Sequence, residues 1–344
     1  MATLLQPAPV QAPRRRRWLR PVAVALLVAL FAVELVLGWP ALADALHQLR
    51  RPQPGWLVAA VVAQLGVMSA YARMQRRLLR SAGVHAPIHK HVAVAYAAHS
   101  LSATLPGGPA FSTRFNYQQM RRFGATPAVA SWCIALSGIL SATALAVVTV
   151  MGALATGGVP DWRHLAALLV AGTLLVLGVR RIARQPETVS RLVLAPLNRL
   201  CRRPADSGAD RISGFLDQLR AARLRPAHAV AASAYALLNW LLDAVCLWLC
   251  CRAVGGGGEI GLNEVLLAFC AAMAAGTITL IPGGLGIIDS ALILGLLAGG
   301  TATSTAVGAV VLYRILSFGF IIGMGWISWL VIRRRYSAPV PAAA

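Results

Sequence analysis

Residues 128–155 read AVASWCIALSGILSATALAVVTVMGALA, a run of 28 residues without one Asp, Glu, Lys or Arg. As an α-helix, which rises about 1.5 Å per residue, this run would be about 42 Å long. The hydrocarbon core of a bilayer is roughly 30 Å thick. The run therefore predicts a helix that spans a membrane, and with it an integral membrane protein.

The composition of the whole chain agrees with this class. Charged residues make up 12% of the 344 residues and apolar residues 58%, whereas a soluble domain carries about 25% charged residues. The net charge of +21, from 32 Lys and Arg against 11 Asp and Glu, would suit nucleic acid. The basic residues form short clusters between apolar runs, however, where they set membrane topology. A soluble enzyme is excluded, and no nucleic-acid partner is expected.

Five further apolar runs predict spanning helices, which gives about six full spans; they cover residues 21–38, 55–72, 164–179, 229–253 and 306–332. One more run, residues 91–105, would be only about 22 Å long as a helix and breaks at Pro106, Gly107 and Gly108. It is too short to cross a typical bilayer. The expected fold is an all-α, polytopic helical bundle.

The basic clusters decide how this short run enters the membrane. If residues 91–125 enter and leave on one side, 27 of the 32 Lys and Arg residues lie on the same side, which the positive-inside rule makes the cytoplasm. If residues 91–105 crossed alone, the eleven arginines of residues 180–228 would face outward. The sequence thus predicts a re-entrant or broken hairpin here, and both termini in the cytoplasm.

The same pattern divides the chain into five segments. We expect a disordered basic segment at 1–20, a first membrane half at 21–182, a basic cytoplasmic linker at 183–228, a second membrane half at 229–335 and a disordered tail at 336–344. Within the linker, Ile212, Phe215, Leu216 and Leu219 have helical spacing. This amphipathic helix either lies on lipid headgroups or packs on the protein's own cytoplasmic face.

A second break resembles the first. Pro282, Gly283 and Gly284 follow Leu-Ile as Pro106 to Gly108 follow Thr-Leu, 176 residues earlier. The topology places the two breaks on opposite sides, as in transporters built from inverted repeats, whose binding sites lie where broken helices meet. Proline removes a backbone donor and glycine frees the backbone, so the released groups must face protein, water or a polar ligand. The alternative is that each break merely closes a tight helical hairpin.

Ionisable residues in apolar surroundings mark candidate substrate-binding groups, since they normally face an aqueous cavity or a partner. Arg314 could bind a phosphate, with Asp289 orienting it or contacting a cationic headgroup; the alternative is a permanent Asp289–Arg314 salt bridge. Arg114 could bind an anion at the cytoplasmic mouth or be an ordinary interfacial arginine. Asp243 could be a buried acid of the site or make a helix–helix hydrogen bond.

Other polar residues are expected to have structural roles. Glu34 and His99 are interpreted as satisfied packing residues. The six cysteines lack His or carboxylate neighbours at ligand spacing and are interpreted as small apolar packing residues. No nucleophile motif, phosphate loop or metal motif occurs. We therefore expect neither an enzyme nor a bound metal or cofactor.

Four motifs together resemble the lysylphosphatidylglycerol synthase transmembrane-region family: LPGGPA at 105–110, NWLLD at 239–243, IPGGLGIID at 281–289, and Tyr313-Arg314. The resemblance covers about residues 15–335. This family is similar to the flippase domain of the bacterial multiple peptide resistance factor. We expect no soluble aminoacyl-transferase domain like that of the fused proteins, so lysyl-lipid synthesis is not implied.

The resemblance implies a protein of the bacterial inner membrane that moves an anionic or aminoacylated phospholipid, or a polyprenyl-linked lipid, between leaflets. Two other functions are considered. One is a non-transporting membrane partner or scaffold of a lipid or envelope synthesis enzyme, engaged through residues 180–228. The other is a transporter of a small water-soluble solute.

Overall fold

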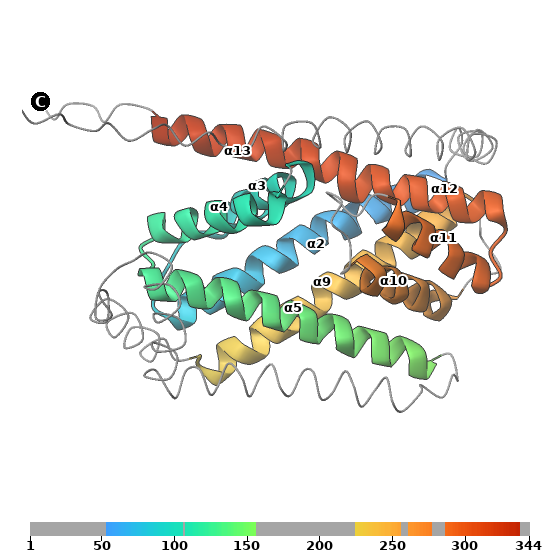
Figure 1. Cartoon of the computed structure of the whole chain (residues 1–344), viewed down its shortest axis with the longest axis horizontal. Helices are drawn as coiled ribbons and strands as arrows, with labels where there is room; N and C mark the ends of the chain where they lie inside the picture. Colours follow the sequence, from blue (N-terminus) through green and yellow to red (C-terminus); the bar gives the residue numbers. More distant parts are fainter. Residues whose placement is uncertain (1–52, 106, 156–223, 256–260, 277–285, 338–344) are drawn as a thin grey trace, which may run out of the picture.

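The computed structural model describes residues 53–105, 107–155, 224–255, 261–276 and 286–337, and every regular element in these ranges is a helix (Figure 1). Four helical segments are long and apolar enough to cross a membrane: Pro54–Ser81, Pro127–Leu154, Pro226–Ala253 and Thr303–Arg334. They match four of the six spans that the sequence predicts. The other two, residues 21–38 and 164–179, lie outside the described residues, as do the amphipathic helix, the segment 1–20 and residues 338–344. Residues 336 and 337, which the sequence analysis assigned to the disordered tail, are helical.

The elements are, in chain order, α2 (Pro54–Ser81), α3 (Ile88–Thr104), α4 (Gly108–Arg122), α5 (Pro127–Ala155), α9 (Pro226–Ala253), α10 (Leu262–Gly276), α11 (Ile287–Ala298), α12 (Thr303–Arg314), the π-helix η3 (Ile315–Phe320) and α13 (Ile321–Ser337). Helices α2, α4 and α9 carry proline in the first turn, where its missing N–H costs no intrahelical bond.

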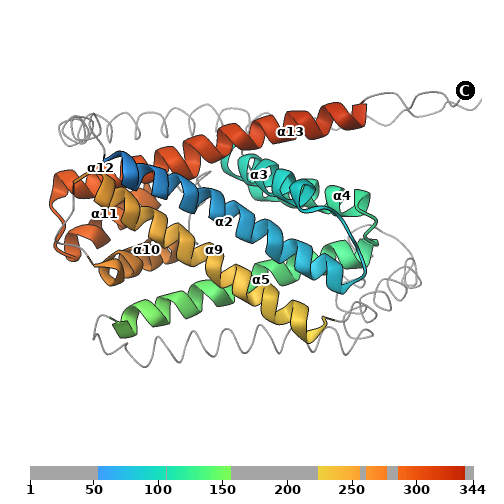
Figure 2. The same ribbon diagram turned by 180° about the vertical axis from the view of Figure 1, so that it is seen from behind.

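The long helices α2 and α9 form an antiparallel pair at the centre of the bundle (Figure 2). At one end the Gln53 N–H donates to the Ala253 carbonyl over 3.0 Å, and at the other the Arg225 N–H donates to Ser81 Oγ over 2.9 Å. Midway, the Asn239 amide donates to the Val67 carbonyl over 2.9 Å. These bonds fix the register of the two helices along their whole length.

Two pairs of short helices approach this centre from opposite ends. The outer ends of α3 and α4 lie at the Ser81 end of α2, where the rings of His91 and Phe123 are 5.1 Å apart between centroids. The outer ends of α10 and α11 lie at the Ala253 end of α9; there a Cβ added to Gly299 would be 3.1 Å from Glu264 Cβ. The inner ends of both pairs therefore point toward the middle of the bundle.

The turns that leave these two pairs have the same backbone conformation. Gly124 after α4 has φ +94°, and Gly300 after α11 has φ +90°, a left-handed conformation that glycine adopts without steric cost. Three backbone hydrogen bonds of the first turn recur in the second turn, with each donor and each acceptor 176 residues later. In the first turn they run from Phe123 N to Gln119 O, from Gly124 N to Arg121 O and from Ala125 N to Met120 O. In the second turn they run from Gly299 N to Gly295 O, from Gly300 N to Leu297 O and from Thr301 N to Leu296 O.

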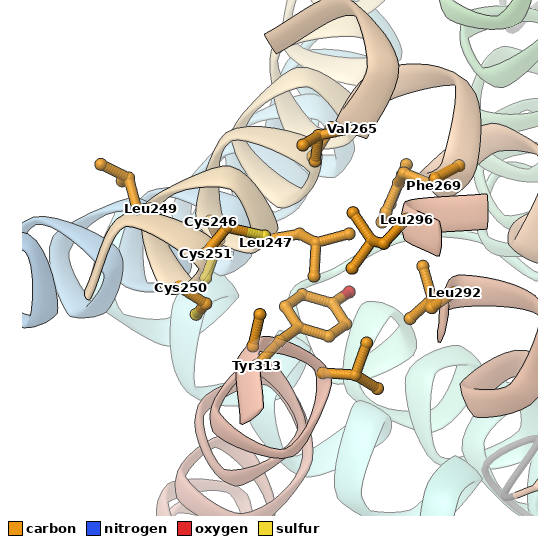
Figure 3. Packing of buried hydrophobic residues seen from close by; sticks show 14 of the residues in the cluster. Cys246, Leu247, Leu249, Cys250, Cys251, Val265, Phe269, Leu292, Leu296 and Tyr313 are labelled. Atoms are coloured by element: carbon orange, nitrogen blue, oxygen red, sulfur yellow. The ribbon is translucent and has the colours of Figure 1, made fainter. Parts of the chain in front are cut away.

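A continuous apolar core joins α9 to the second helix pair. Phe269, Leu292 and Leu296 pack with Leu247 around the ring of Tyr313 (Figure 3). The five cysteines in the described ranges are free and buried. They pack as small apolar residues, as the sequence indicates.

Candidate functional site

A cavity of about 610 Å³ lies where the inner ends of the two helix pairs meet α2, α9, α12 and η3. Its wall is largely apolar and contains a small set of polar or ionisable side chains; these are Gln64, His99, Ser102, Trp240, Asp243, Tyr313, Arg314 and Ser317. A mostly apolar cavity with a few convergent polar groups is typical of a ligand-binding site.

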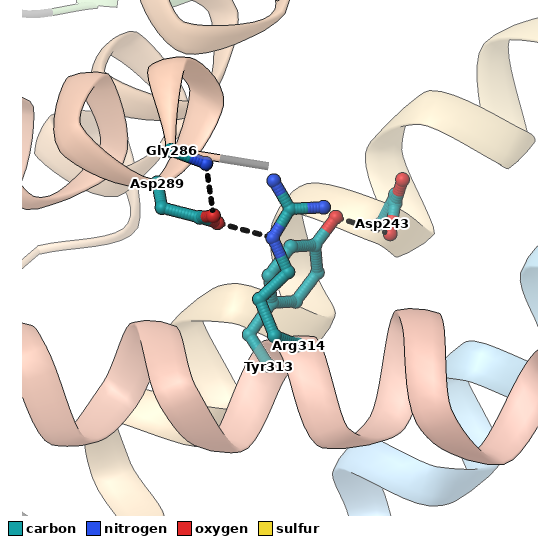
Figure 4. Close-up of polar contacts among 5 residues, drawn as sticks. All are labelled: Asp243, Gly286, Asp289, Tyr313 and Arg314. Atoms are coloured by element: carbon teal, nitrogen blue, oxygen red, sulfur yellow. Dashed lines mark hydrogen bonds and ion pairs between the residues drawn. The ribbon is translucent and has the colours of Figure 1, made fainter. Parts of the chain in front are cut away.

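Arg314, at the end of α12, forms an ion pair with Asp289 of α11 through its Nε atom (Figure 4). The second carboxylate oxygen of Asp289 accepts a hydrogen bond of 3.0 Å from the Gly286 N–H at the start of α11. A carboxylate in the first turn of a helix also interacts favourably with the helix dipole. Asp289 is thus held from two sides and orients the guanidinium.

The neighbouring Tyr313 reaches a different acid. Its hydroxyl donates to Oδ1 of Asp243 on α9 over 3.0 Å. Two adjacent residues of α12 therefore connect this helix to α11 and to α9, and the side chains of Tyr313 and Arg314 rise together from α12 in Figure 4. The structure thus brings Asp289 and Arg314 into contact, as expected both for an Asp289 that orients Arg314 and for a permanent salt bridge.

The ion pair leaves part of the guanidinium without a partner. Within the described ranges, Arg314 Nη2, Gln64 Oε1 and Ser317 Oγ are buried polar atoms that make no hydrogen bond, and all three residues line the cavity. A buried unsatisfied polar group costs about 1–3 kcal/mol. The three atoms belong to residues that line one cavity, which makes this cavity the candidate site for a polar ligand.

The backbone next to Arg314 is irregular. The π-helix η3 follows it directly, and two of its residues, Ser317 and Phe318, line the cavity. Short π-helical turns are rare and frequently occur at functional sites. The span that the sequence predicts over 306–332 lies within the continuous helical segment Thr303–Arg334, which widens into a π-turn at the point where it passes the cavity.

The glycines of the first break close the cavity at the inner end of α3 and α4. Gly107 has φ +71°, and a Cβ added to Gly108 would collide with the Ser102 carbonyl; both glycines line the cavity. Pro106, Pro282, Gly283 and Gly284 lie outside the described residues. Their role in the wall stays a prediction.

Arg114 does not reach this cavity. It is exposed on α4 and lines a separate groove between α4 and α5, together with Tyr117, Ser131 and Ile134. Pro109 lines both the groove and the cavity. The two sites are therefore neighbours, joined at the start of α4.

The sequence analysis missed several polar residues of the cavity, among them Gln64 and Ser317. Gln64 is a single amide in the apolar part of α2, only 2% exposed, and a polar residue so placed is itself a signal of a helix contact or a site. Ser317 gives no such signal, because serine is common in membrane helices. His99, interpreted as a packing residue, also lines the cavity. Among the described residues, no three His, Cys, Asp or Glu side chains lie close enough together to hold a metal ion.

The long apolar helices, with a cavity between them that carries a few polar groups, define a multi-pass α-helical membrane protein. The family model described as "Lysylphosphatidylglycerol synthase TM region" matches residues 19–325, and the chain belongs to this family. The motifs at 105–110, 239–243, 281–289 and 313–314 thus indicated the family correctly. The chain is also similar to a "UPF0104 membrane protein" of Methanothermobacter thermautotrophicus, with 24% identity over 316 residues, 87% of this chain and 91% of that protein.

Proposed function

We propose that this protein translocates a lipid with a phosphate-bearing headgroup between the leaflets of the bacterial inner membrane. The observation that carries the proposal is the Arg314 guanidinium, oriented by Asp289 while its Nη2 atom has no hydrogen-bond partner beside the cavity. A guanidinium is planar and matches phosphate geometry with two parallel N–H donors. Ser317 adds a hydroxyl donor from the next turn.

The groove beside the cavity supports a lipid as the substrate. It is lined mainly by apolar atoms and meets the cavity at Pro109. A lipid could keep its acyl chains in the groove or in the bilayer while its headgroup enters the cavity, with the exposed Arg114 as the first contact for the phosphate. A water-soluble solute has no acyl chains to place in an apolar groove. The groove therefore favours the lipid over the small-solute alternative.

The arrangement of the two helix pairs supports alternating access through an inverted repeat. The equal hydrogen bonds after α4 and α11, and the starts of α5 and α12 at residues 127 and 303, repeat with the same spacing of 176. The pairs approach the cavity from opposite ends, as repeats inverted in the membrane would. In this proposal α3 and α4 are re-entrant from the cytoplasm, α10 and α11 re-enter from outside, and both termini are cytoplasmic.

The proposal is tested by purified protein in liposomes that contain fluorescent phosphatidylglycerol in both leaflets. A membrane-impermeant reductant quenches only outer-leaflet label. We expect quenching to proceed beyond half of the label in proteoliposomes and to stop near half in protein-free liposomes. Quenching that stops at the same level with and without protein, for labelled phosphatidylglycerol, phosphatidylethanolamine and polyprenyl phosphate alike, would exclude translocation of these lipids.

The same preparation separates the alternatives. A small-solute transporter would take up a water-soluble substrate without moving lipid. A non-transporting partner of an envelope-synthesis enzyme would move neither, and would co-purify with that enzyme in stoichiometric amount. That alternative depends on residues 180–228, nearly all of which lie outside the described ranges.

Arg114→Ala is expected to slow the initial rate of lipid translocation by about 1.5- to 5-fold, because an exposed charge contributes about 0.2–1 kcal/mol to an ionic contact. The loss should shrink as salt is raised, since ions screen exposed charges. The matched control is Arg73→Ala, an exposed arginine on α2 that lines neither the groove nor the cavity. Equal rates for both variants would remove Arg114 from the entry route.

A further inference from the structure

The charged residues at the cavity do not balance. Among the described residues, Asp243 in the cavity wall and Asp289, which pairs with Arg314, are two carboxylates around the one guanidinium of Arg314. Asp289 forms the ion pair, whereas Asp243 accepts a hydrogen bond from the neutral phenol of Tyr313. A carboxylate inside a membrane is costly unless a positive charge compensates it. Within the described site, Asp243 therefore shares Arg314 with Asp289 and has no second cation.

A bound phosphate would increase this imbalance. If Arg314 binds a phosphate, as proposed above, three negative groups surround one guanidinium: the phosphate, Asp243 and Asp289. A further positive charge must then accompany the lipid for the bound state to be stable. The smallest ion that carries such a charge is a proton. A proton can be bound by a single carboxylate oxygen that is in contact with the cavity.

Asp243 offers that oxygen. Its Oδ1 atom accepts the Tyr313 hydrogen bond, so Oδ2 is the oxygen available to a proton. Gln64 lies on the facing helix at the same level, because Ala60 pairs with Cys246 and Val67 with Asn239 in the antiparallel register of α2 and α9. Its Oε1 atom, buried and without a partner, can accept a hydrogen bond from a protonated group or from water in the cavity.

We propose that Asp243 is a proton-binding site that couples lipid movement to the proton gradient across the membrane. The inference rests on the proposed lipid translocation. A proton from water on one side binds Oδ2 and converts the carboxylate to a neutral carboxylic acid; after the cavity opens to the other side, the same proton returns to water. No other bond forms or breaks, and Tyr313 keeps its hydroxyl proton throughout.

The other titratable groups near Asp243 are less suited to this role. Tyr313 acts as a donor, and Arg314 is engaged by Asp289. On α9 itself, Cys246 donates to the Ala60 carbonyl and Cys250 is buried in the core. His99 of α3 lines the cavity but as a neutral ring would add positive charge on protonation, so it could assist Asp243 without replacing it.

Infrared difference spectroscopy tests the proton site without any transport. Among protein side chains, only a protonated carboxylic acid gives the high-frequency C=O band, so histidine and cysteine do not contribute. The ester carbonyls of the lipid absorb nearby but do not titrate, so they cancel in the pH difference spectrum. We expect the native protein in liposomes to show such a band that disappears as pH rises, Asp243→Asn to lack it, and the control Glu264→Gln, an acid on α10 outside the cavity wall, to retain it. A band that persists unchanged in Asp243→Asn, or no titrating band in the native protein, would overturn the proposal.

Transport under a pH gradient tests the coupling. For one proton per lipid, a gradient of one pH unit supports up to about a tenfold difference in labelled lipid between leaflets. We expect the native protein to build up such a difference. Under the same gradient, Asp243→Asn should accumulate no labelled lipid in either leaflet beyond an equal distribution. If the native protein moves lipid but the distribution between leaflets is the same with and without the pH gradient, coupling is refuted and the proposed function stands. Absence of all lipid movement would refute the proposed function, and the infrared result alone would then decide proton binding.

Discussion

Replacing Arg314 by alanine is expected to slow lipid translocation by about 10- to 150-fold. The guanidinium would donate charge-assisted hydrogen bonds to the phosphate, each worth about 1.5–3 kcal/mol, and about 1.4 kcal/mol corresponds to a factor of ten. The loss should appear with every phosphate-bearing lipid that the native protein moves. It is measured as the rate of label quenching in proteoliposomes that contain equal amounts of folded protein.

Two further variants separate binding from folding. Arg314→Lys keeps the positive charge but loses the planar pair of donors, so an intermediate rate is expected. Arg314→Ala also leaves Asp289 without its cation, which destabilises the α11–α12 contact; adding Asp289→Asn should recover part of the unfolding temperature but none of the transport. The matched control is Arg333→Ala, an arginine on α13 whose Cζ atom lies 5.1 Å from the centroid of the Trp329 ring and which does not line the cavity. A native transport rate in Arg314→Ala would refute the proposed site.

Gly325→Ala is expected to have the largest effect on stability. A Cβ at this position of α13 would overlap both Ser100 Oγ and the Tyr96 carbonyl of α3. The Tyr96 carbonyl is part of the backbone and cannot rotate away, so α3 and α13 must separate. Overpacking of this kind costs about 1–3 kcal/mol, and the separation would also break the 3.1 Å bond from Ser100 Oγ to the Ile322 carbonyl. The measurement is thermal unfolding in detergent.

The control lies two residues away on the same helix. Gly323 has open space where a Cβ would be placed, so Gly323→Ala should leave stability unchanged or raise it by up to about 1 kcal/mol, the difference in helix propensity between the two residues. Because α3 leads to the inner end that closes the cavity, Gly325→Ala should also reduce translocation. If both variants unfolded at the same temperature as the native protein, the close α3–α13 contact would be incorrect.

The sequence by itself determined the class of protein, four of the spans and the family. Chargeless or nearly chargeless runs such as 128–155 must be helical in a bilayer, because every backbone group has to be satisfied within the segment. Even for these runs, the predicted helix ends differ from the ends in the structure. The run 55–72 is part of a helix that continues to Ser81, since its arginines extend the helix beyond the hydrocarbon without breaking it. Local composition indicates where a chain leaves the hydrocarbon and says less about where a helix stops.

The partners of the polar residues were decided only by the tertiary structure. The pair Asp289–Arg314 could be suggested from sequence because both residues stand out in apolar runs. The bond from Tyr313 to Asp243 spans 70 residues, and Gln64 faces the same cavity from α2; no local pattern connects them. Arg114, grouped with these residues by its charge, lies in the neighbouring groove. Which side chains meet depends on the register in which helices pack, and that register is set by close contacts such as Gly66 with Leu242, which involve residues far apart in the chain.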